Sequence, residues 1–260
     1  MKLVSYISPN FWPGLKVLAH SLAHKGNISG VPWIVMTDEP APKEWGDWLG
    51  FCGFDMIDVR FSQVGTLPAE LPGTADHLKF NFNKLRMFLL PDGEYIYLDV
   101  DFLCLRDAGA LLTTPSLTAA NERPGISNGM INAGLIRFDG GPAGEWMFSK
   151  CMHAIDMTVL AGLRLGLAEQ TIINTVIMRN RKAPEARVHL LGDEWNMPAF
   201  LATRNPKLWR PDRAIFVHYT GQSKPWMGIE RRAREERDRN PPQKKAIDIW
   251  RDYAETELSR

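Results

Sequence analysis

Apolar and polar residues follow a strand–helix–strand pattern over the first part of the chain. Residues 3–7 form a short apolar run, and residues 13–25 carry apolar side chains at the three- and four-residue spacing of an amphipathic helix. Residues 31–36 form a second apolar run, which ends at a polar Thr-Asp pair. A strand, a helix and a strand in succession are typical of proteins with a mostly parallel sheet. We therefore predict an α/β fold in which helices flank that sheet.

The remainder of the chain continues this alternation. The strongest strand pattern is the apolar run at residues 95–98, which leads directly into two aspartates. No internal repeat or low-complexity linker interrupts the chain, so we expect one domain over residues 1–226. Weaker strand patterns lie at 56–59, 117–120, 135–138 and 215–217, and helical patterns lie at 78–89, 146–163 and 169–179.

A helical tail is expected after that domain, over residues 227–260. Residues 230–239 include five arginines and four acidic residues, so the two signs nearly cancel and indicate a salt-bridged helix face rather than a polybasic anchor. Ala246, Trp250 and Tyr253 follow at helical spacing and form one apolar stripe. We expect this stripe to dock against the domain, with peripheral contact to the inner face of a membrane as the alternative.

Composition excludes several classes of protein. Hydrophobic residues make up 45% of the 260 positions and charged residues 23%, as in globular proteins rather than disordered chains. The formal net charge of +1 gives no electrostatic basis for binding nucleic acid. The three cysteines contain no CxxC pair, and no apolar run resembles a signal peptide or approaches the roughly 18 residues of a transmembrane helix. We therefore expect a cytoplasmic protein with no transmembrane segment.

The two aspartates after the strongest strand are the first candidates for chemistry. Asp99 and Asp101 are separated by one residue, so on an extended backbone both carboxylates point to the same side. Open α/β sheets bind ligands at the carboxyl ends of their strands. Two adjacent carboxylates repel each other unless a cation lies between them, and a divalent ion that also binds phosphate oxygens meets this need.

A second group of polar residues follows the last predicted strand. His218 begins the run His-Tyr-Thr-Gly-Gln-Ser-Lys-Pro-Trp, which contains Gly221 and Lys224. An imidazole can complete a carboxylate site for Mn²⁺. The glycine allows the backbone to approach a ligand closely, and the lysine can place a positive charge on a phosphate. We therefore expect this run to belong to the same site as the aspartates.

Together these motifs resemble those of the family 8 retaining glycosyltransferases, which include glycogenin and bacterial lipopolysaccharide galactosyltransferases and glucosyltransferases. Asp-Val-Asp at 99–101 matches the D-x-D motif of that family, and residues 218–226 match its C-terminal signature. Ile-Asn-Ala-Gly-Leu at 131–135 is similar to its F-N-[AS]-G-V element, and Glu-Gln-Thr-Ile-Ile-Asn at 169–174 to its D-Q-x-x-L-N element. The four motifs occur in the family's order, and Lys84 lies where the family has a basic residue before the D-x-D strand.

The resemblance implies a fold, a reaction and a set of site residues. The fold is the GT-A type of nucleotide-diphospho-sugar transferases. The reaction is metal-dependent transfer of glucose or galactose, with retention, from a UDP-linked donor to a glycan, glycolipid or protein acceptor. Asp99, Asp101 and His218 would bind Mn²⁺ or Mg²⁺, and Glu169 and Gln170 are the candidate catalytic residues. The donor would be bound by Ser8, Phe11, Lys84, Val100, Asn132, Gly221 and Lys224.

The match departs from the family at one catalytic position. The family has Asp where this chain has Glu169, whose side chain is one methylene longer, so a catalytically inactive nucleotide-sugar-binding module is the main alternative. A further acidic position of the family corresponds to either Asn121 or Glu122. A haloacid dehalogenase phosphatase also has D-x-D at a strand end, but near the chain start and with Thr or Val in place of Leu103. A nucleotidyltransferase would carry a Gly- and Arg-rich loop near its start, which this chain lacks.

Overall fold

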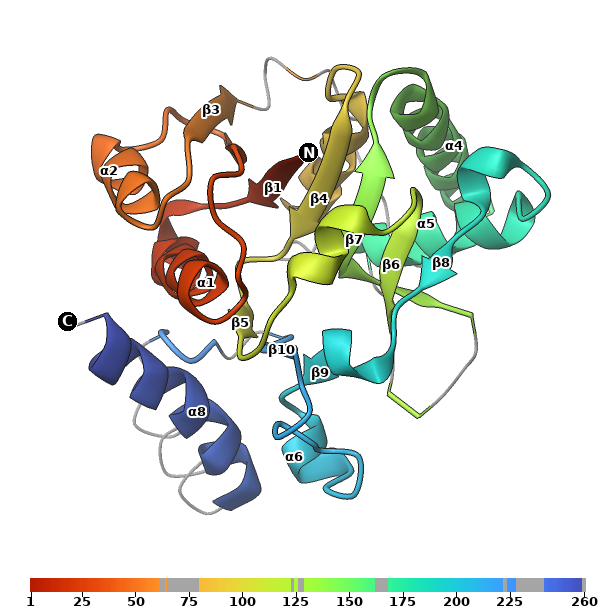
Figure 1. Ribbon diagram of the computed structural model, residues 1–260. Coiled ribbons are helices and arrows are strands. Elements are labelled where there is room, and N and C mark those ends of the chain that lie inside the picture. The colour runs from red at the N-terminus through yellow and green to blue at the C-terminus, as the bar shows by residue number, and fades with distance from the viewer. Residues whose placement is uncertain are drawn as a thin grey trace.

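A seven-stranded sheet forms the centre of the protein in the computed structural model (Figure 1). The structure describes residues 1–60, 64, 80–122, 124–125, 129–161, 168–221, 224–227 and 241–258. The strand order is β3-β2-β1-β4-β7-β6-β8. The first four run parallel to one another, β7 is antiparallel to both its neighbours, and β8 is parallel to β6, which confirms the mostly parallel sheet. The strands are β1 (Lys2–Tyr6), β2 (Trp33–Thr37), β3 (Met56–Arg60), β4 (Glu94–Leu98), β6 (Thr118–Asn121), β7 (Ile131–Asp139) and β8 (His189–Leu190).

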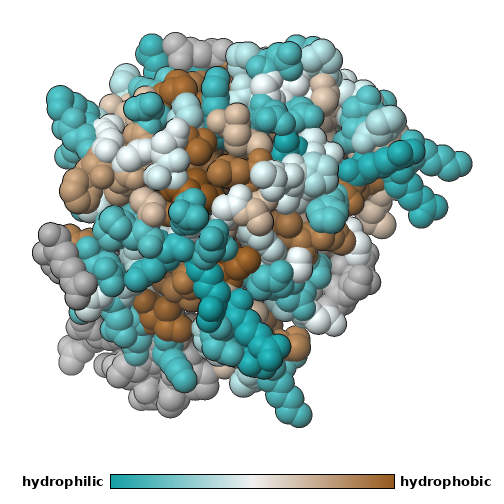
Figure 2. Space-filling view, viewed as in Figure 1, coloured by the Kyte–Doolittle hydropathy of each residue, from teal (hydrophilic) through white to brown (hydrophobic). Residues whose placement is uncertain are grey.

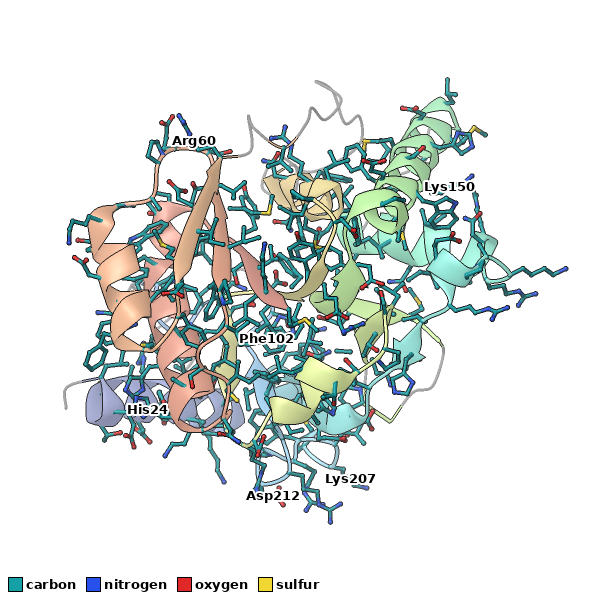
Figure 3. All side chains as sticks on the ribbon, turned by 45° about the horizontal axis from the view of Figure 1, so that its top comes forward. His24, Arg60, Phe102, Lys150, Lys207 and Asp212 are labelled. Atoms are coloured by element: carbon teal, nitrogen blue, oxygen red, sulfur yellow. The ribbon has the colours of Figure 1, made fainter. Side chains whose placement is uncertain are left out.

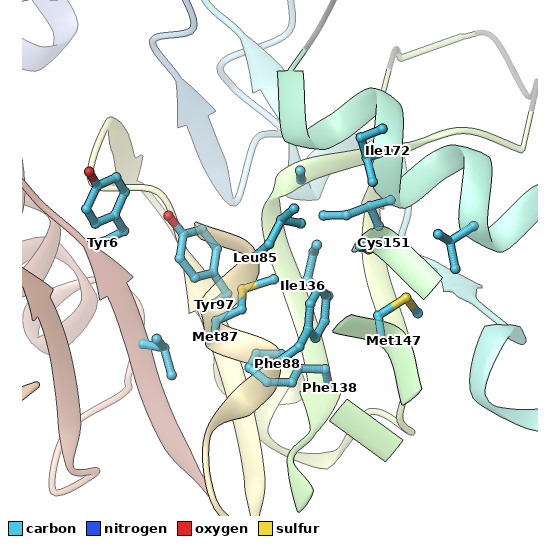
Figure 4. Close-up of a cluster of buried hydrophobic side chains, with 14 of the residues drawn as sticks. Tyr6, Leu85, Met87, Phe88, Tyr97, Ile136, Phe138, Met147, Cys151 and Ile172 are labelled. Atoms are coloured by element: carbon cyan, nitrogen blue, oxygen red, sulfur yellow. The ribbon is translucent and has the colours of Figure 1, made fainter. Parts of the chain in front are cut away.

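Helices cover both faces of this sheet (Figure 1). Leu3 of β1 points into a core shared with α1 (Trp12–His24) and α2 (Lys43–Phe51). The next residue, Val4, points into the opposite core, because side chains alternate along a strand. That second core contains Phe88, Phe138 and Met147, which lie together in Figure 4. Three helices supply its outer wall: the 3-10 helix η3 (Phe80–Leu89), α4 (Gly141–Leu160) and α5 (Ala168–Arg179).

A second, three-stranded sheet lies at the carboxyl end of β4. It contains β5 (Phe102–Cys104), β10 (Phe216–His218) and β9 (Met197–Pro198), in the order β5-β10-β9. The antiparallel pairing of β5 and β10 places His218 opposite Phe102, one residue after Asp101. This pairing therefore brings together two of the sequence motifs that are more than a hundred residues apart. Phe102 is fully buried and lies at the centre of the molecule in Figure 3, whereas the labelled His24, Lys150 and Lys207 lie toward its periphery.

Several expected elements differ in type or extent. The apolar pattern at 78–89 predicts an α-helix, but its described part is a 3-10 helix that begins at Phe80. The helix predicted at 146–163 begins earlier, at Gly141. The sequence patterns assigned no element to α2, whose two glycines weaken its helical signal. Shorter elements complete the fold: η1 (Pro9–Phe11), η4 (Gly109–Thr113), η5 (Pro184–Ala186), η6 (Asp193–Trp195) and α6 (Leu201–Arg204).

The last helix, α8 (Pro241–Glu257), docks against the remainder of the protein through the expected apolar stripe. Ala246, Trp250 and Tyr253 are all buried, and the two aromatic residues share a core cluster with Val17 of α1 and Leu103 of β5. The charged segment at 230–239 lies outside the described residues. Among the described helices, none combines the length and hydrophobicity needed to cross a membrane. Figure 2 shows hydrophilic side chains over much of one face, with apolar side chains in smaller patches between them.

Candidate active site

The two aspartates lie where β4 leaves the central sheet and the chain enters β5. The backbone N–H of Asp99 donates to the carbonyl of Gly134 on β7, with an N–O distance of 2.8 Å. The carbonyl of Asp101 accepts from the backbone N–H of Tyr219, immediately after β10, at 2.9 Å. Both aspartates are therefore held by strands that neighbour them in space, one from each sheet.

Asp99, Asp101 and His218 form a compact group with ligand atoms within 4.8 Å of one another. Asp101 and His218 are buried, and Asp99 is half-buried. Nε2 of His218 lies 3.1 Å from Oδ1 of Asp101. The imidazole ring stacks on Phe102 with a centroid distance of 4.0 Å, which fixes the plane of the ring. The three residues expected to bind a metal thus lie together.

The hydrogen bonds around His218 make this group suitable for a cation. The side-chain NH₂ of Asn196 donates to the carbonyl of Asn121 at 2.8 Å, so its Oδ1 is the acceptor for Nδ1 of His218 at 2.9 Å. A neutral imidazole held in this way carries its proton on Nδ1 and directs the lone pair of Nε2 toward Asp101. Oδ1 of Asp101 is buried without a hydrogen-bond partner in the described structure. Two facing lone pairs favour a positive ion between them, so these residues fit a divalent metal.

Gly134 provides the space around this group. A Cβ atom at this position would lie 2.8 Å from Oδ2 of Asp99, 2.8 Å from Cε1 of His218 and 2.9 Å from Oδ1 of Asn132. Distances this short would force those side chains to move. The glycine of the Ile-Asn-Ala-Gly-Leu motif therefore keeps space for the carboxylate and imidazole groups.

Two buried lysines balance the charge of the carboxylates. Nζ of Lys84 lies 2.9 Å from Oδ1 of Asp99 and 2.9 Å from Oε1 of Glu169. Nζ of Lys224 donates to Oδ2 of Asp101 and, at 2.9 Å, to the carbonyl of Tyr219. The site therefore has two lysine–carboxylate clusters. The metal-binding group shares Asp99 with the first cluster and Asp101 with the second.

Burial and pairing act in opposite directions on these acids and bases. Burial disfavours ionisation of Asp101, but ion pairing, chiefly with the ammonium group of Lys224, outweighs burial and holds the pKa of this carboxyl below its ordinary value. Burial raises the pKa of Glu169, and Lys84 only partly opposes that shift. Burial also opposes the charge on Lys84, but Asp99 and Glu169 together raise the pKa of its ammonium group. Lys84 therefore remains charged, as the shared partner of two acids.

Polar side chains tie the start of α5 to β7. Oε1 of Gln170 accepts from the backbone N–H of Ala133 at 3.0 Å, and Oδ1 of Asn132 accepts from the N–H of Gly134 at 2.9 Å. Asn174 bonds both the N–H and the carbonyl of Ile131, at 2.8 and 3.0 Å. The Asn-Ala-Gly and Glu-Gln motifs are thus one structural unit, and this unit places Glu169 beside Lys84.

The other residues expected to bind the donor have different surroundings in the structure. Phe11 packs edge-on against Trp226, with ring centroids 5.8 Å apart, and its centroid lies 5.9 Å from Nζ of Lys224. Ser8 occupies the N-cap position of η1 without a side-chain capping hydrogen bond. Val100 turns its side chain into the core, and its carbonyl lies close to Gly14 of α1. Gly221 has a φ of 95°, a conformation that favours glycine.

Sequence reasoning missed two residues of the site. Asn196 orients His218, and Tyr97 donates its hydroxyl to Oδ1 of Asp99 at 2.8 Å. Tyr97 stands two residues before Asp99 on the same strand, so period-two alternation could have placed its side chain on the same face. Nothing in the sequence pattern marks Asn196. Of the two candidates for a further acidic position, Asn121 contacts the site only through its carbonyl, which accepts from Asn196.

Comparisons with known proteins establish the fold. No protein-family model and no curated protein matches the sequence. The glycosyltransferase GlyE of Streptococcus pneumoniae TIGR4 is similar in structure, with a TM-score of 0.65 and 18% identity, over 99% of this chain and 62% of GlyE. The galactosyltransferase LgtC, solved with donor and acceptor sugar analogues, has a TM-score of 0.59 and 17% identity, over 97% of this chain and 100% of LgtC. The bifunctional glycosyltransferase WbbM has a TM-score of 0.62 and 16% identity, over 87% of this chain and 46% of WbbM.

This chain thus spans about 62% of the length of GlyE but matches LgtC over its whole length. At these identities the likeness shows the fold. The α/β architecture, with its mostly parallel central sheet, is the GT-A type of these glycosyltransferases, as the sequence motifs predicted.

Proposed function

We propose that this protein is a metal-dependent retaining glycosyltransferase of the family 8 type, which transfers glucose or galactose from a UDP-linked donor. The acceptor would be a glycan, a glycolipid or a protein. The observation that carries this proposal is the group of Asp99, Asp101 and His218 at the end of β4, with ligand atoms within 4.8 Å of one another. In a GT-A fold this edge of the sheet is where a nucleotide sugar would bind. The three buried free cysteines fit the cytoplasmic setting expected from the sequence.

Asp99, Asp101 and His218 would hold Mn²⁺ or Mg²⁺, and the mixed oxygen and nitrogen ligands favour Mn²⁺. When bound, the ion would stabilise the negative charge that develops on the diphosphate as the sugar leaves. Lys224 forms an ion pair with Asp101, and its ammonium group can provide a second positive charge beside the same phosphate. Asn196 would keep Nε2 of His218 directed at the ion, because its Oδ1 accepts a hydrogen bond from the Nδ1–H of the imidazole.

Phe11 and Lys224 support the position of the donor, because the ring and the ammonium group lie 5.9 Å apart beside the metal-binding group. In this proposal Phe11 and Ser8 contact the uridine, Lys224 and Gly221 contact the diphosphate, and the backbone at Val100 contributes to the nucleotide site. Asn132 and Lys84 lie on the other side of Asp99, toward Glu169, where the sugar would bind. The choice of UDP rests on the resemblance of the sequence motifs.

Retention can arise if the acceptor attacks on the face from which the diphosphate departs. The acceptor oxygen then bonds to the anomeric carbon as the bond to the β-phosphate oxygen breaks, and the acceptor proton passes to that phosphate oxygen. Glu169 is buried and ion-paired with Lys84 at 2.9 Å, which supports a positioning role rather than a nucleophilic one. Gln170 is anchored through its Oε1, so its NH₂ end can donate to a sugar hydroxyl.

The proposal is tested by incubating the protein with UDP-glucose and UDP-galactose labelled in the sugar, with Mn²⁺ and with EDTA. We expect release or transfer of label with Mn²⁺ and none with EDTA. Asp101→Asn should abolish this activity, because it removes the negative charge that His218 and Lys224 both face, whereas Asp47→Asn on the exposed face of α2 should not. Tight binding of donor without release of sugar by the wild-type protein would instead identify an inactive nucleotide-sugar-binding module.

A further inference from the structure

The C-terminal helix α8 contacts the segment that carries Lys224. The hydroxyl of Tyr219 donates to the carbonyl of Ala246 on α8 at 2.9 Å. The ring of Trp250 packs against Trp226 with a centroid distance of 5.5 Å. Nη2 of Arg251 lies 3.5 Å from the carbonyl of Pro225. Two successive turns of the helix therefore reach residues on both sides of Lys224.

Those same residues determine where the Lys224 ammonium group lies. Its Nζ donates to the carbonyl of Tyr219 at 2.9 Å and to Asp101, so a shift of the backbone at Tyr219 would move the charge. Trp226, two residues after Lys224, is held from its other side. Its Nε1 donates to the carbonyl of Asn10 at 3.1 Å.

Close packing limits the freedom of Trp226 still further. A Cβ atom placed on Gly14 would lie 2.6 Å from the edge of the Trp226 ring and 2.6 Å from the carbonyl of Val100. Trp226 is therefore enclosed between the start of α1 and Trp250 of α8. Trp250 is 6% exposed, so its contact is part of the packed interior rather than a surface contact.

We propose that α8 is a positioning element of the active site, and that Ala246 and Trp250 hold Tyr219 and Trp226, on either side of Lys224, so that Lys224 reaches the diphosphate of the donor. This inference rests on the proposed function. It assigns a role to a helix that the sequence separates from the catalytic motifs. Because the proposed metal ligands come from the turn between β4 and β5 and from β10 rather than from α8, loosening the helix should weaken nucleotide binding without weakening metal binding.

The test uses the whole chain in two calorimetric titrations. The first titrates Mn²⁺ alone, and the second titrates UDP in the presence of Mn²⁺. We expect Trp250→Ala to weaken UDP binding by about tenfold or more, since misplacement of a binding group by an ångström has effects of this size. The affinity for Mn²⁺ alone should stay within about twofold of wild type. A variant that was merely less stable would lose affinity for both ligands in proportion to its unfolded fraction.

A matched pair of tyrosine substitutions serves if Trp250→Ala does not fold. Tyr219→Phe and Tyr253→Phe each remove one hydroxyl hydrogen bond that joins α8 to the domain, to Ala246 in the first case and to His20 in the second. We expect similar small losses of thermal stability, but weaker UDP binding only for Tyr219→Phe, because only that bond reaches the Lys224 segment. If folded Trp250→Ala bound UDP as tightly as the wild type, or if the two tyrosine variants bound UDP equally well, the role of α8 would be overturned. The proposed function would not be affected by either result. Failure of the wild-type protein to bind UDP with Mn²⁺ would overturn the proposed function and this inference with it.

Discussion

At the scale of single residues, the site is a balance of buried charges. Lys84 bridges Asp99 and Glu169, and Lys224 pairs with Asp101. A buried carboxylate that loses its partner costs about 3–5 kcal/mol, so each acid depends on its lysine for stability as well as for function. Removing the charge of Glu169 should cost less stability than removing that of Asp101. Without the charge on Glu169, Lys84 still has Asp99 as a partner.

Glu169→Gln should therefore fold and keep partial activity. The amide preserves the length of the side chain and can still make some of the hydrogen bonds that we propose for Glu169 with the sugar, so we expect the rate to fall by about 10- to 100-fold. A nucleophile would lose several orders of magnitude. Steady-state rates with the labelled donor measure the difference, with Glu185→Gln on the exposed η5 as the control. A glycosyl adduct trapped on Glu169 and detected by mass spectrometry would contradict the positioning role.

At the scale of elements, the site depends on how closely strands and helices approach one another. β7 lies beside β4, and a Cβ atom on its Gly134 would lie 2.8 Å from both the carboxylate of Asp99 and the imidazole of His218. A small side chain there would occupy the space that these groups need. The requirement for glycine at this position is therefore steric, because its φ is not in the left-handed region.

Gly134→Ala should weaken Mn²⁺ binding by at least about tenfold while the protein remains folded, because the added methyl group displaces the side chains of Asp99 and His218. Gly50→Ala is the matched control: it lies in α2 with no atom within 4 Å of the added Cβ. That control should bind Mn²⁺ normally and gain up to about 1 kcal/mol in stability from helix propensity. Unchanged Mn²⁺ affinity in Gly134→Ala would show that the ion does not bind between these side chains.

The contact between α1 and α8 should respond to acid. Burial, and to a smaller extent His24, lower the pKa of His20 below its ordinary value of 6.5, whereas Glu257 opposes the shift and Lys25 adds to it. His20 also shares a hydrogen bond with Tyr253 of α8 at 2.9 Å. A group whose pKa is lower in the folded state takes up a proton on unfolding, so stability is lost as pH falls below the ordinary pKa.

We therefore expect the thermal midpoint to decrease between about pH 7.5 and 5.5, and to decrease less in His20→Gln. His189→Gln, at an exposed histidine on β8, should follow the wild-type curve. Differential scanning fluorimetry across this pH range measures the thermal midpoints of the wild type and the two variants. Parallel curves for wild type and His20→Gln would exclude His20 as the titrating group.

At the scale of the whole molecule, the candidate active site lies at the carboxyl edge of the central sheet, next to the second sheet and to the residues that α8 contacts. A ligand bound there contacts elements from most of the chain. Its binding free energy should therefore stabilise the protein as a unit rather than a single segment.

UDP with Mn²⁺ should raise the thermal midpoint by about 5–10 °C. This follows from about 2.7 kcal/mol at a hundredfold excess over Kd and about 2–4 °C for each kcal/mol in a protein of this size. GDP and CDP should give smaller shifts, and EDTA should remove the effect of UDP. Stabilisation by GDP or CDP but not by UDP would show that the predicted donor is wrong, although the fold would be unaffected.

The sequence by itself was enough to predict the fold class and the three residues that lie together as the candidate metal site. Its strand and helix periods follow from local geometry. The extended backbone expected at D-x-D was wrong in detail: Asp99 and Asp101 lie in the turn between β4 and β5, where the backbone N–H of Phe102 donates to the carbonyl of Asp99 at 3.3 Å. Local patterns were less reliable where backbone geometry depends on packing. Residues 80–89 form a 3-10 helix against the core, although their apolar spacing predicted an α-helix.

Only the tertiary structure decided which distant residues act on those ligands. Asn196 orients His218, Lys84 bridges Asp99 and Glu169, and α8 reaches the segment around Lys224. No period or motif encodes these contacts, because each one joins residues that are adjacent only after strands pair and helices pack. Hydrogen bonds and ion pairs act over a few ångströms in space, whereas sequence patterns report only on neighbours along the chain.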